Sequence, residues 1–244
     1  VVRGHAADLH VRACAAVGVP PAEVAKTLMR IARRTEWDWV DDAPERYADL
    51  LGDDGLAALD KALTKARAAE RSDPTVPSWK RSHLEMTLGL MAESSARVAG
   101  DTDRLVAVMA DDLSSAWCYV QVADVLEQAG REREALDWLE RGRAAFGADD
   151  SRLRGRLTAA YRRDGLDDEA LSVAWDHLLS RPTAAAVAEL RDVCGEDGWP
   201  THREDALATL KRDPGELGAA LVDDGDPAAA QEVAERAQIG IGPR

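Results

Sequence analysis

Apolar side chains recur along the chain at the spacing of an α-helix. Leu84, Leu88 and Met91 stand at positions i, i+4 and i+7, and the segments 24–31 and 56–63 follow the same pattern. This period gathers the apolar residues on one helix face. No convincing run alternates strictly between apolar and polar residues, as a half-buried strand requires. The pattern therefore predicts an all-α protein.

The composition and the residues at the expected helix ends support that prediction. Ala, Leu, Arg and Glu dominate the chain, and these residues favour helix over sheet. Prolines and aspartates precede many of the periodic segments, as is typical of helix starts. We expect helices near 5–17, 21–35, 44–51, 54–71, 78–99, 101–111, 114–129, 131–146, 150–164, 167–180, 183–195, 200–212, 214–224 and 227–238.

One segment interrupts the helical pattern most clearly. Residues 72–78 read Ser-Asp-Pro-Thr-Val-Pro-Ser, and two prolines prevent a helix from passing through them. Because such a segment has few backbone hydrogen bonds to protect it, we expect it to be the most protease-sensitive internal site. We divide the chain into an N-terminal helical array (1–98) and a set of helix pairs (99–244) within one continuous solenoid.

The second half of the chain repeats itself. Gly100, Gly130, Gly165 and Gly225 each end an expected helix, at the position where a left-handed conformation costs glycine nothing. A charged turn and a helix rich in small residues follow each glycine, and the first two such helices begin 35 residues apart, counted from Ala135 to Ala170. A period in the mid-thirties is typical of stacked helix pairs. It predicts a right-handed α-solenoid of antiparallel pairs.

Particular residues give this repeat a resemblance to the tetratricopeptide pattern. In 114–147 the large, small and turn positions are held by Tyr119, Val122, Ala123, Leu126, Gly130, Ala135 and Leu139. In 149–182 they are held by Leu157, Tyr161, Gly165, Ala170, Ala174 and Pro182. The second repeat departs from the pattern at Arg154, where an aromatic residue is usual, and at Thr158, where a small residue is usual. The resemblance implies an α-α superhelix that presents a concave groove.

The whole chain also resembles an uncharacterised helical family common in actinobacteria. The segments Trp37-Asp-Trp39 and 47–56 carry that resemblance. In that family the helical region often follows a SWIM-type zinc finger, whose Cys-x-Cys and Cys-x-His spacings are missing from this sequence. Because the chain begins without Met, just before an amphipathic segment, we interpret it as a piece of a longer protein.

Charge and cysteine content narrow the function classes. The chain has 31 basic and 45 acidic side chains, so its formal net charge is −14. That balance disfavours broad binding to nucleic acid or to an anionic membrane. No apolar stretch approaches the roughly 20 residues of a membrane span, and no signal peptide opens the sequence. Three scattered cysteines indicate reduced thiols in a cytoplasmic protein.

The sequence contains no motif for catalysis or metal binding. His10 and Cys14 can share a helix face, but two ligands do not make a structural zinc site. The acid-rich turns lack the glycine and distal Glu of a calcium loop, and no nucleophile elbow or phosphate loop is present. Cys118 has no base placed beside it in sequence. We expect no metal, no cofactor and no enzymatic activity.

A local excess of arginine marks one candidate site. Residues 131–163 hold nine Arg against six acids, a net charge of +3 within a chain of −14. When the groove positions of tetratricopeptide repeats are carried across, they fall on Trp117, Asp124, Glu127, Arg152, Arg162 and Arg163. The arginines can bind carboxylates or phosphates in a bidentate manner, or they can pair with nearby Asp149, Asp164 or Asp168 on a solvated face.

Three function classes follow from these observations. The leading one is a non-catalytic scaffold that binds a protein or peptide partner, with an acidic partner favoured by the arginines. The alternative is an accessory region of a SWIM zinc-finger-type nucleic-acid-binding protein, although this segment alone is a poor nucleic-acid binder at its net charge. An enzyme with a composite groove site is a remote third.

Overall fold

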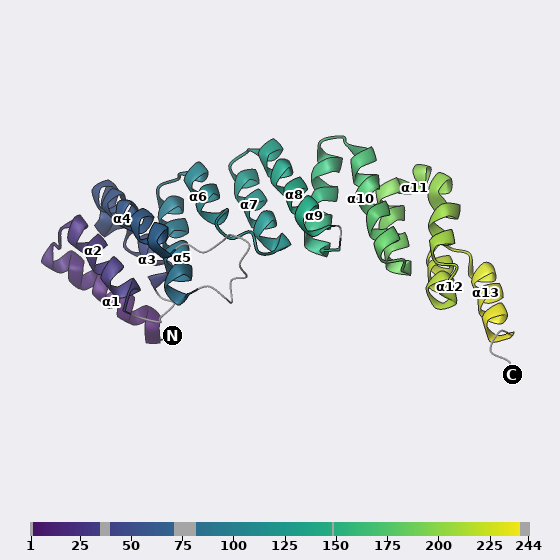
Figure 1. Ribbon diagram of the computed structural model, residues 1–244, viewed down its shortest axis with the longest axis horizontal. Coiled ribbons are helices and arrows are strands. Elements are labelled where there is room, and N and C mark those ends of the chain that lie inside the picture. The colour runs from purple at the N-terminus through teal and green to yellow at the C-terminus, as the bar shows by residue number, and fades with distance from the viewer. Residues whose placement is uncertain (1, 35–39, 71–81, 148, 240–244) are drawn as a thin grey trace. The chain divides into compact units, whose positions relative to one another are not determined.

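The described residues fold entirely into helices and turns. The computed structural model describes residues 2–34, 40–70, 82–147 and 149–239, and no strand occurs in these ranges (Figure 1). The prediction of an all-α protein is confirmed. The helices are α1 (Val2–Val17), α2 (Pro21–Ala32), α3 (Ala43–Arg46), α4 (Ala48–Glu70), α5 (His83–Val98), α6 (Thr102–Met109), α7 (Ala116–Gln128), α8 (Glu132–Phe146), α9 (Ser151–Arg163), α10 (Asp167–Ser180), α11 (Ala184–Thr209), α12 (Pro214–Asp223) and α13 (Pro227–Ile239).

The chain forms two compact units, 1–131 and 132–244. In the first unit α2 packs on α4, and α4, α5, α6 and α7 then pack in succession. In the second unit each helix from α8 to α13 packs on the next. The division at 98/99 that the sequence suggests remains a prediction. The Trp37–Trp39 motif and the segment 72–78 lie outside the described residues.

Two glycines kink the helices near the predicted breaks. The sequence predicts separate helices at 44–51 and 54–71, and α4 consists of two helical segments that meet at Gly52, which is non-helical at φ 49° and ψ −168°. It also predicts a gap between 195 and 200, whereas α11 resumes directly after Gly195 at φ 67° and ψ 174°. One glycine in a conformation that other residues rarely adopt changes the helix direction without a loop. Pro200 therefore lies inside α11 instead of starting a helix.

The four turn glycines adopt the predicted conformation. Gly100, Gly130, Gly165 and Gly225 have φ values of 65°, 73°, 71° and 83°. After each glycine, the next backbone N–H donates to a carbonyl five residues back, as in the 2.8 Å bond from Leu166 N to Tyr161 O. This is the Schellman arrangement, which satisfies the last carbonyls of a helix. The same turn thus recurs four times, at the sites that the sequence predicts.

Acidic residues in several turns act as helix caps. The Asp101 carboxylate accepts a 3.0 Å hydrogen bond from Arg104 N, and Asp150 accepts from two backbone N–H groups of α9. Asp213 does the same at the start of α12. Such bonds satisfy N–H groups that have no partner within the helix. The caps account for much of the acid-rich turn chemistry.

Close packing of α2 against α4 forms the core between these two helices. Leu28 of α2 and Leu59 and Leu63 of α4 are completely or almost completely buried between them. A Cβ atom added to Gly55 would stand 2.9 Å from the Cβ of Pro21, at the start of α2. Glycine therefore permits the short approach of the two helices. Their outward faces consequently meet in one continuous surface.

Candidate binding groove

The six residues that the sequence nominates fall into two groups. Trp117, Asp124 and Glu127 lie on α7 in the first unit, where Trp117 is 41% exposed. Arg152, Arg162 and Arg163 lie on α9 in the second unit, and all three are exposed. Each helix thus gathers its own three residues. A groove that joins the two groups remains a prediction.

Two of the α9 arginines take part in surface ion pairs. The Nε of Arg163 donates to Asp164 Oδ1 at 2.8 Å, and this hydrogen bond lowers the pKa of Asp164. Arg162 Nη1 lies 3.7 Å from an oxygen of Asp192 on α11, and both side chains are more than half exposed. Exposed pairs of this kind contribute little stability. The sequence had left open a solvated, acid-paired face, and the Arg163–Asp164 pair is an example of it.

Arg154, unlike Arg162 and Arg163, has a buried side chain that contacts another helix. Its side chain is only 9% exposed, and its Nε lies 2.6 Å from Glu189 Oε1 on α11. The other oxygen of Glu189 lies 3.0 Å from His177 Nδ1 on α10. A carboxylate from two helices further along the chain thus meets the buried guanidinium of Arg154. No sequence pattern predicted the ion pair between Arg154 and Glu189, or the position of His177 beside Glu189.

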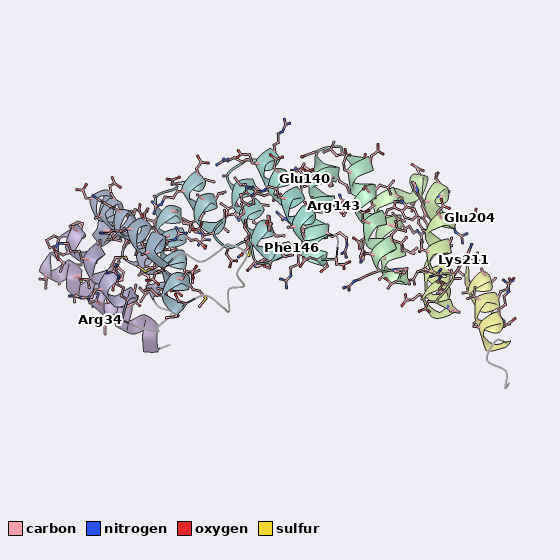
Figure 2. All side chains as sticks on the ribbon, in the orientation of Figure 1. Arg34, Glu140, Arg143, Phe146, Glu204 and Lys211 are labelled. Carbon is pink, nitrogen blue, oxygen red and sulfur yellow. The ribbon has the colours of Figure 1, made fainter. Side chains whose placement is uncertain are left out.

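Similar polar contacts join the other helices of the second unit. Glu140 and Arg143 lie about one turn apart on α8 (Figure 2), and Glu140 accepts a 2.9 Å hydrogen bond from the Tyr161 hydroxyl. Contacts between residues 30 to 35 positions apart include Arg143–Asp176, Ser180–Asp149, Arg154–Glu189, Arg162–Asp192, Ala184–Glu216 and Arg191–Asp223. These separations are close to the period that the sequence predicts. Many charged side chains of this unit therefore hold helices together.

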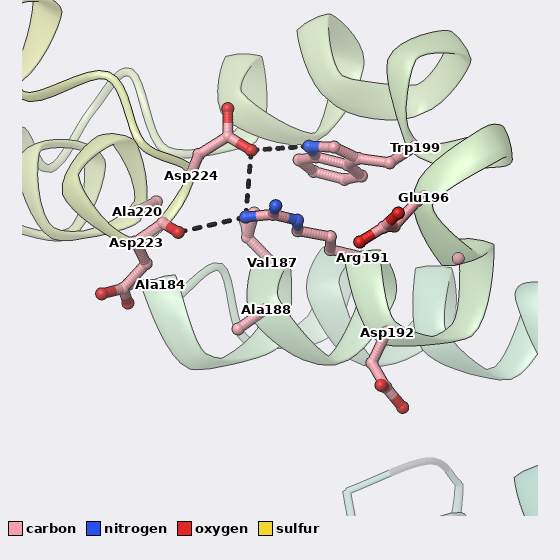
Figure 3. A pocket seen from close by; sticks show the side chains of 11 residues that line it. Ala184, Val187, Ala188, Arg191, Asp192, Glu196, Trp199, Ala220, Asp223 and Asp224 are labelled. Atoms are coloured by element: carbon pink, nitrogen blue, oxygen red, sulfur yellow. Dashed lines mark hydrogen bonds and ion pairs between the residues drawn. The ribbon is translucent and has the colours of Figure 1, made fainter.

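A pocket in the second unit contains a buried carboxylate that is engaged in the same way. Its volume is about 290 Å³, and α11 and α12 line it (Figure 3). Figure 3 shows Trp199 and Arg191 converging on Asp224, whose side chain is 6% exposed. Trp199 Nε1 donates to Asp224 Oδ1 at 2.6 Å, and Arg203 pairs with the other oxygen. The buried carboxylate is thus neutralised by its own chain and ties the second half of α11 to the end of α12.

A further polar cluster, in the first unit, combines a thiol, an imidazole and a phenol. Cys14 Sγ lies 3.7 Å from His10 Nε2, and His10 Nδ1 lies 2.7 Å from the hydroxyl of Tyr47. Tyr47 is completely buried, and burial is the main cause that raises its pKa to about 12. His10 and Cys14 lie on the same face of α1, as predicted. That face packs against the buried Tyr47. Within the described ranges, no group of three His, Cys, Asp or Glu side chains can hold a metal ion.

The clearest binding surface is a groove between α2 and α4, which we call the basic groove. Its volume is about 660 Å³. Its floor consists of Ala22, Ala25, Met29, Ala58 and Ala62. Its rims consist of six exposed cations, Lys26, Arg30, Arg33, Arg34, Lys61 and Lys65, of which Arg34 is labelled in Figure 2. No acidic side chain is among the lining residues within the described ranges, in a chain whose net charge is −14.

Most of the rim cations remain available. Lys26 pairs with Glu23 at 2.6 Å, and Arg30 donates to the Thr27 hydroxyl at 3.3 Å. The other four, Arg33, Arg34, Lys61 and Lys65, form no ion pair with any part of the chain that the structure describes. Like charges on neighbouring turns repel one another. An anionic ligand would relieve that repulsion.

A short stretch of the sequence indicates the basic groove. The net charge of longer segments hides it. Residues 24–34 hold four cations and no acid, while Val24, Leu28 and Ala32 of the same segment are buried in the core. The partner cations on α4 stand about 30 residues further along the chain. Only the packing of α2 on α4 brings the two sets together.

No helix among the described residues combines the length and the apolar character that crossing a bilayer requires. Comparison of the chain with models of protein families and with curated proteins finds no match.

Proposed function

We propose that this chain is a non-catalytic helical scaffold that binds protein partners. The observation that carries the proposal is the basic groove, an apolar floor between two rows of cations. Apolar floors with charged rims are typical of surfaces that recognise peptides and helices. The charged side chains in the interior of the second unit instead pair with each other across helices. These pairs therefore serve packing between helices.

The proposed architecture is a right-handed, tetratricopeptide-like α-solenoid of antiparallel helix pairs. Two observations support it. The same glycine turn closes α5, α7, α9 and α12, and polar contacts in the second unit recur at separations of 30 to 35 residues. Stacked helix pairs present extended surfaces of the kind that scaffolds use.

Two further proposed binding surfaces each lie within one unit: Trp117, Asp124 and Glu127 on α7, and Arg152, Arg162 and Arg163 on α9. The first offers Trp117 to an apolar anchor of a peptide, and the second favours an acidic group. Replacement of the three arginines by Glu should leave stability nearly unchanged, because exposed helix positions tolerate such changes within about 0.5 kcal/mol each.

The test is capture of binding partners by the immobilised full chain from the source cell, with identification by mass spectrometry. We expect proteins that the wild-type chain retains and that one of two charge-reversed chains loses: the triple variant above or Lys61→Glu with Lys65→Glu. Recovery of nucleic acid instead would favour the alternative class. In that case duplex DNA held by three arginines gives a log–log salt slope of about −2.7. Identical capture by all three chains would contradict the scaffold proposal.

A further inference from the structure

We propose that the basic groove between α2 and α4 binds one acidic, amphipathic α-helix of a partner protein. The inference rests on the proposed scaffold function and specifies the chemistry of one partner. It is carried by charge complementarity and by the composition of the groove floor. Both helices of the basic groove lie in the first unit.

The floor of the basic groove fits the apolar face of a helix. Four of its five side chains are alanines, and the fifth is Met29. Small side chains let a third helix approach closely, since interaxial distances of about 8–10 Å depend on the side chains at the contact. Met29 is unbranched and polarisable, so it adapts to the shape of the apolar side chains that pack on it. Burial of Leu or Ile side chains of the partner on this floor removes apolar surface from water.

The rims of the basic groove fit the acidic flanks of the same helix. Lys26, Arg30 and Arg33 follow one another at intervals of four and three residues, and Lys61 and Lys65 are four residues apart. On a helix these intervals correspond to a rise of about 5–6 Å each. Glu side chains at i, i+4 and i+7 on a partner helix have the same repeat. Each flank of the partner can therefore form a row of ion pairs with one rim.

Other anions use the basic groove less well. Single-stranded nucleic acid is held by cations together with aromatic side chains on which bases stack, and none of the lining residues that the structure describes is aromatic. Duplex DNA would engage the rims but would leave the apolar floor unused. A small anion would contact one or two of the six cations, which spread along several helical turns. Only an amphipathic acidic helix engages both the floor and the two rims.

The binding test uses the full chain and three synthetic peptides of about five helical turns. The first carries a Leu stripe flanked by Glu. The second has Ser in place of Leu, and the third has Lys in place of Glu. We expect the first peptide to bind, with fluorescence anisotropy as the measurement and helix induction by circular dichroism as a second readout. The Ser and Lys peptides should bind at least about tenfold more weakly, because each lacks one half of the recognition.

Charge-reversed variants locate the site. Lys61→Glu with Lys65→Glu should weaken binding of the first peptide by about tenfold or more, through lost ion pairs and new repulsion. The matched control is Lys211→Glu with Arg212→Glu, which reverses two exposed cations in the second unit (Lys211 is labelled in Figure 2). The control should bind within about twofold of wild type. Circular dichroism of both variants checks that the helices remain folded.

The variant Ala62→Arg distinguishes binding of an acidic helix from binding of a polyanion. The larger side chain fills the floor while it adds a positive charge, so binding of the Leu–Glu peptide should fall, whereas binding of duplex DNA or heparin should rise. Equal binding of the Ser peptide, or tighter binding of every ligand to the Ala62→Arg chain, would overturn the inference. If the peptide fails to bind while the chain still captures proteins through the α7 and α9 residues, the scaffold function survives and this inference fails. If neither surface binds a protein, the proposed function fails as well.

Discussion

The buried ion pair between α9 and α11 offers a quantitative test of how the second unit is held together. The perturbation is replacement of Arg154 and Glu189 by Met, singly and together. Arg154 is 9% exposed and Glu189 is 30% exposed, and their atoms approach to 2.6 Å. Methionine keeps most of the side-chain volume, so the loss of charge dominates the loss of packing.

The expected magnitudes follow from the different exposure of the two partners. Loss of one partner from a fully buried pair costs about 3–5 kcal/mol. Glu189 is partly solvated and keeps His177 at 3.0 Å, so Arg154→Met should cost only about 1–2 kcal/mol. Glu189→Met leaves the guanidinium in a site from which water is largely excluded, and it should cost about 2–4 kcal/mol. The double variant should lie within about 1 kcal/mol of wild type, because apolar residues of similar volume replace buried pairs well.

The assay is urea denaturation followed by far-ultraviolet circular dichroism, with hydrogen exchange measured on peptides of α9 and α11. The double-mutant cycle should give a coupling energy of about 2 kcal/mol or more. Arg163→Met is the matched control, since Arg163 is exposed and pairs with its neighbour Asp164. It should change stability by less than about 0.5 kcal/mol. Additive effects in the cycle, or equal costs for Arg154→Met and Arg163→Met, would refute the reasoning.

Four further predictions concern single positions. Trp199→Phe removes the N–H that donates to Asp224 at 2.6 Å, and urea denaturation should show a loss of about 1–3 kcal/mol because that carboxylate is buried. Gly165→Ala should cost about 1 kcal/mol, because its φ of 71° disfavours a Cβ. Gly155→Ala should instead stabilise by about 0.5–1 kcal/mol, since it lies inside α9 where an added Cβ meets nothing within 4 Å. Thermal melts of these two variants should therefore shift in opposite directions. Burial raises the pKa of Tyr47 from 10.0 to about 12, so the unfolded chain loses this proton first and stability should fall as pH rises from 10 to 12. Tyr47→Phe should reduce that pH dependence in unfolding experiments monitored by circular dichroism, and an unchanged dependence would contradict the assignment.

Most helices were predictable because their signals are local. A helix face follows from apolar spacing within a few turns, and a helix end follows from one glycine or one capping acid. Gly130 and Gly165 accordingly adopt the expected conformation. The break at Gly52 lies where the sequence predicts it, whereas the helix after Gly195 begins earlier than predicted. The sequence shows that a helix changes direction at such a residue, but it does not show whether a loop or a single kink makes the change.

The candidate binding surfaces were far less predictable. The arginine-rich stretch 131–163 drew attention because its charges are close in sequence, yet the structure uses Arg143 and Arg154 to hold helices together. The basic groove combines charges that are distant in sequence, on α2 and α4. The local signal is a run of four cations without an acid in 24–34. It indicates a binding surface only when the packing of α4 brings Lys61 and Lys65 beside it.

The sequence by itself determined that the described chain is helical and where most of its helices begin and end, since hydrogen bonds within a helix depend on residues three to five positions apart. The tertiary structure alone decided which charges are buried, which are paired and which remain free on a common surface. Arg154 and Arg163 are the same residue type on one helix, yet one is buried against Glu189 and the other is solvated beside Asp164. The physical reason is that desolvation and Coulomb attraction act through space, so their strength is set by the helices that pack nearby.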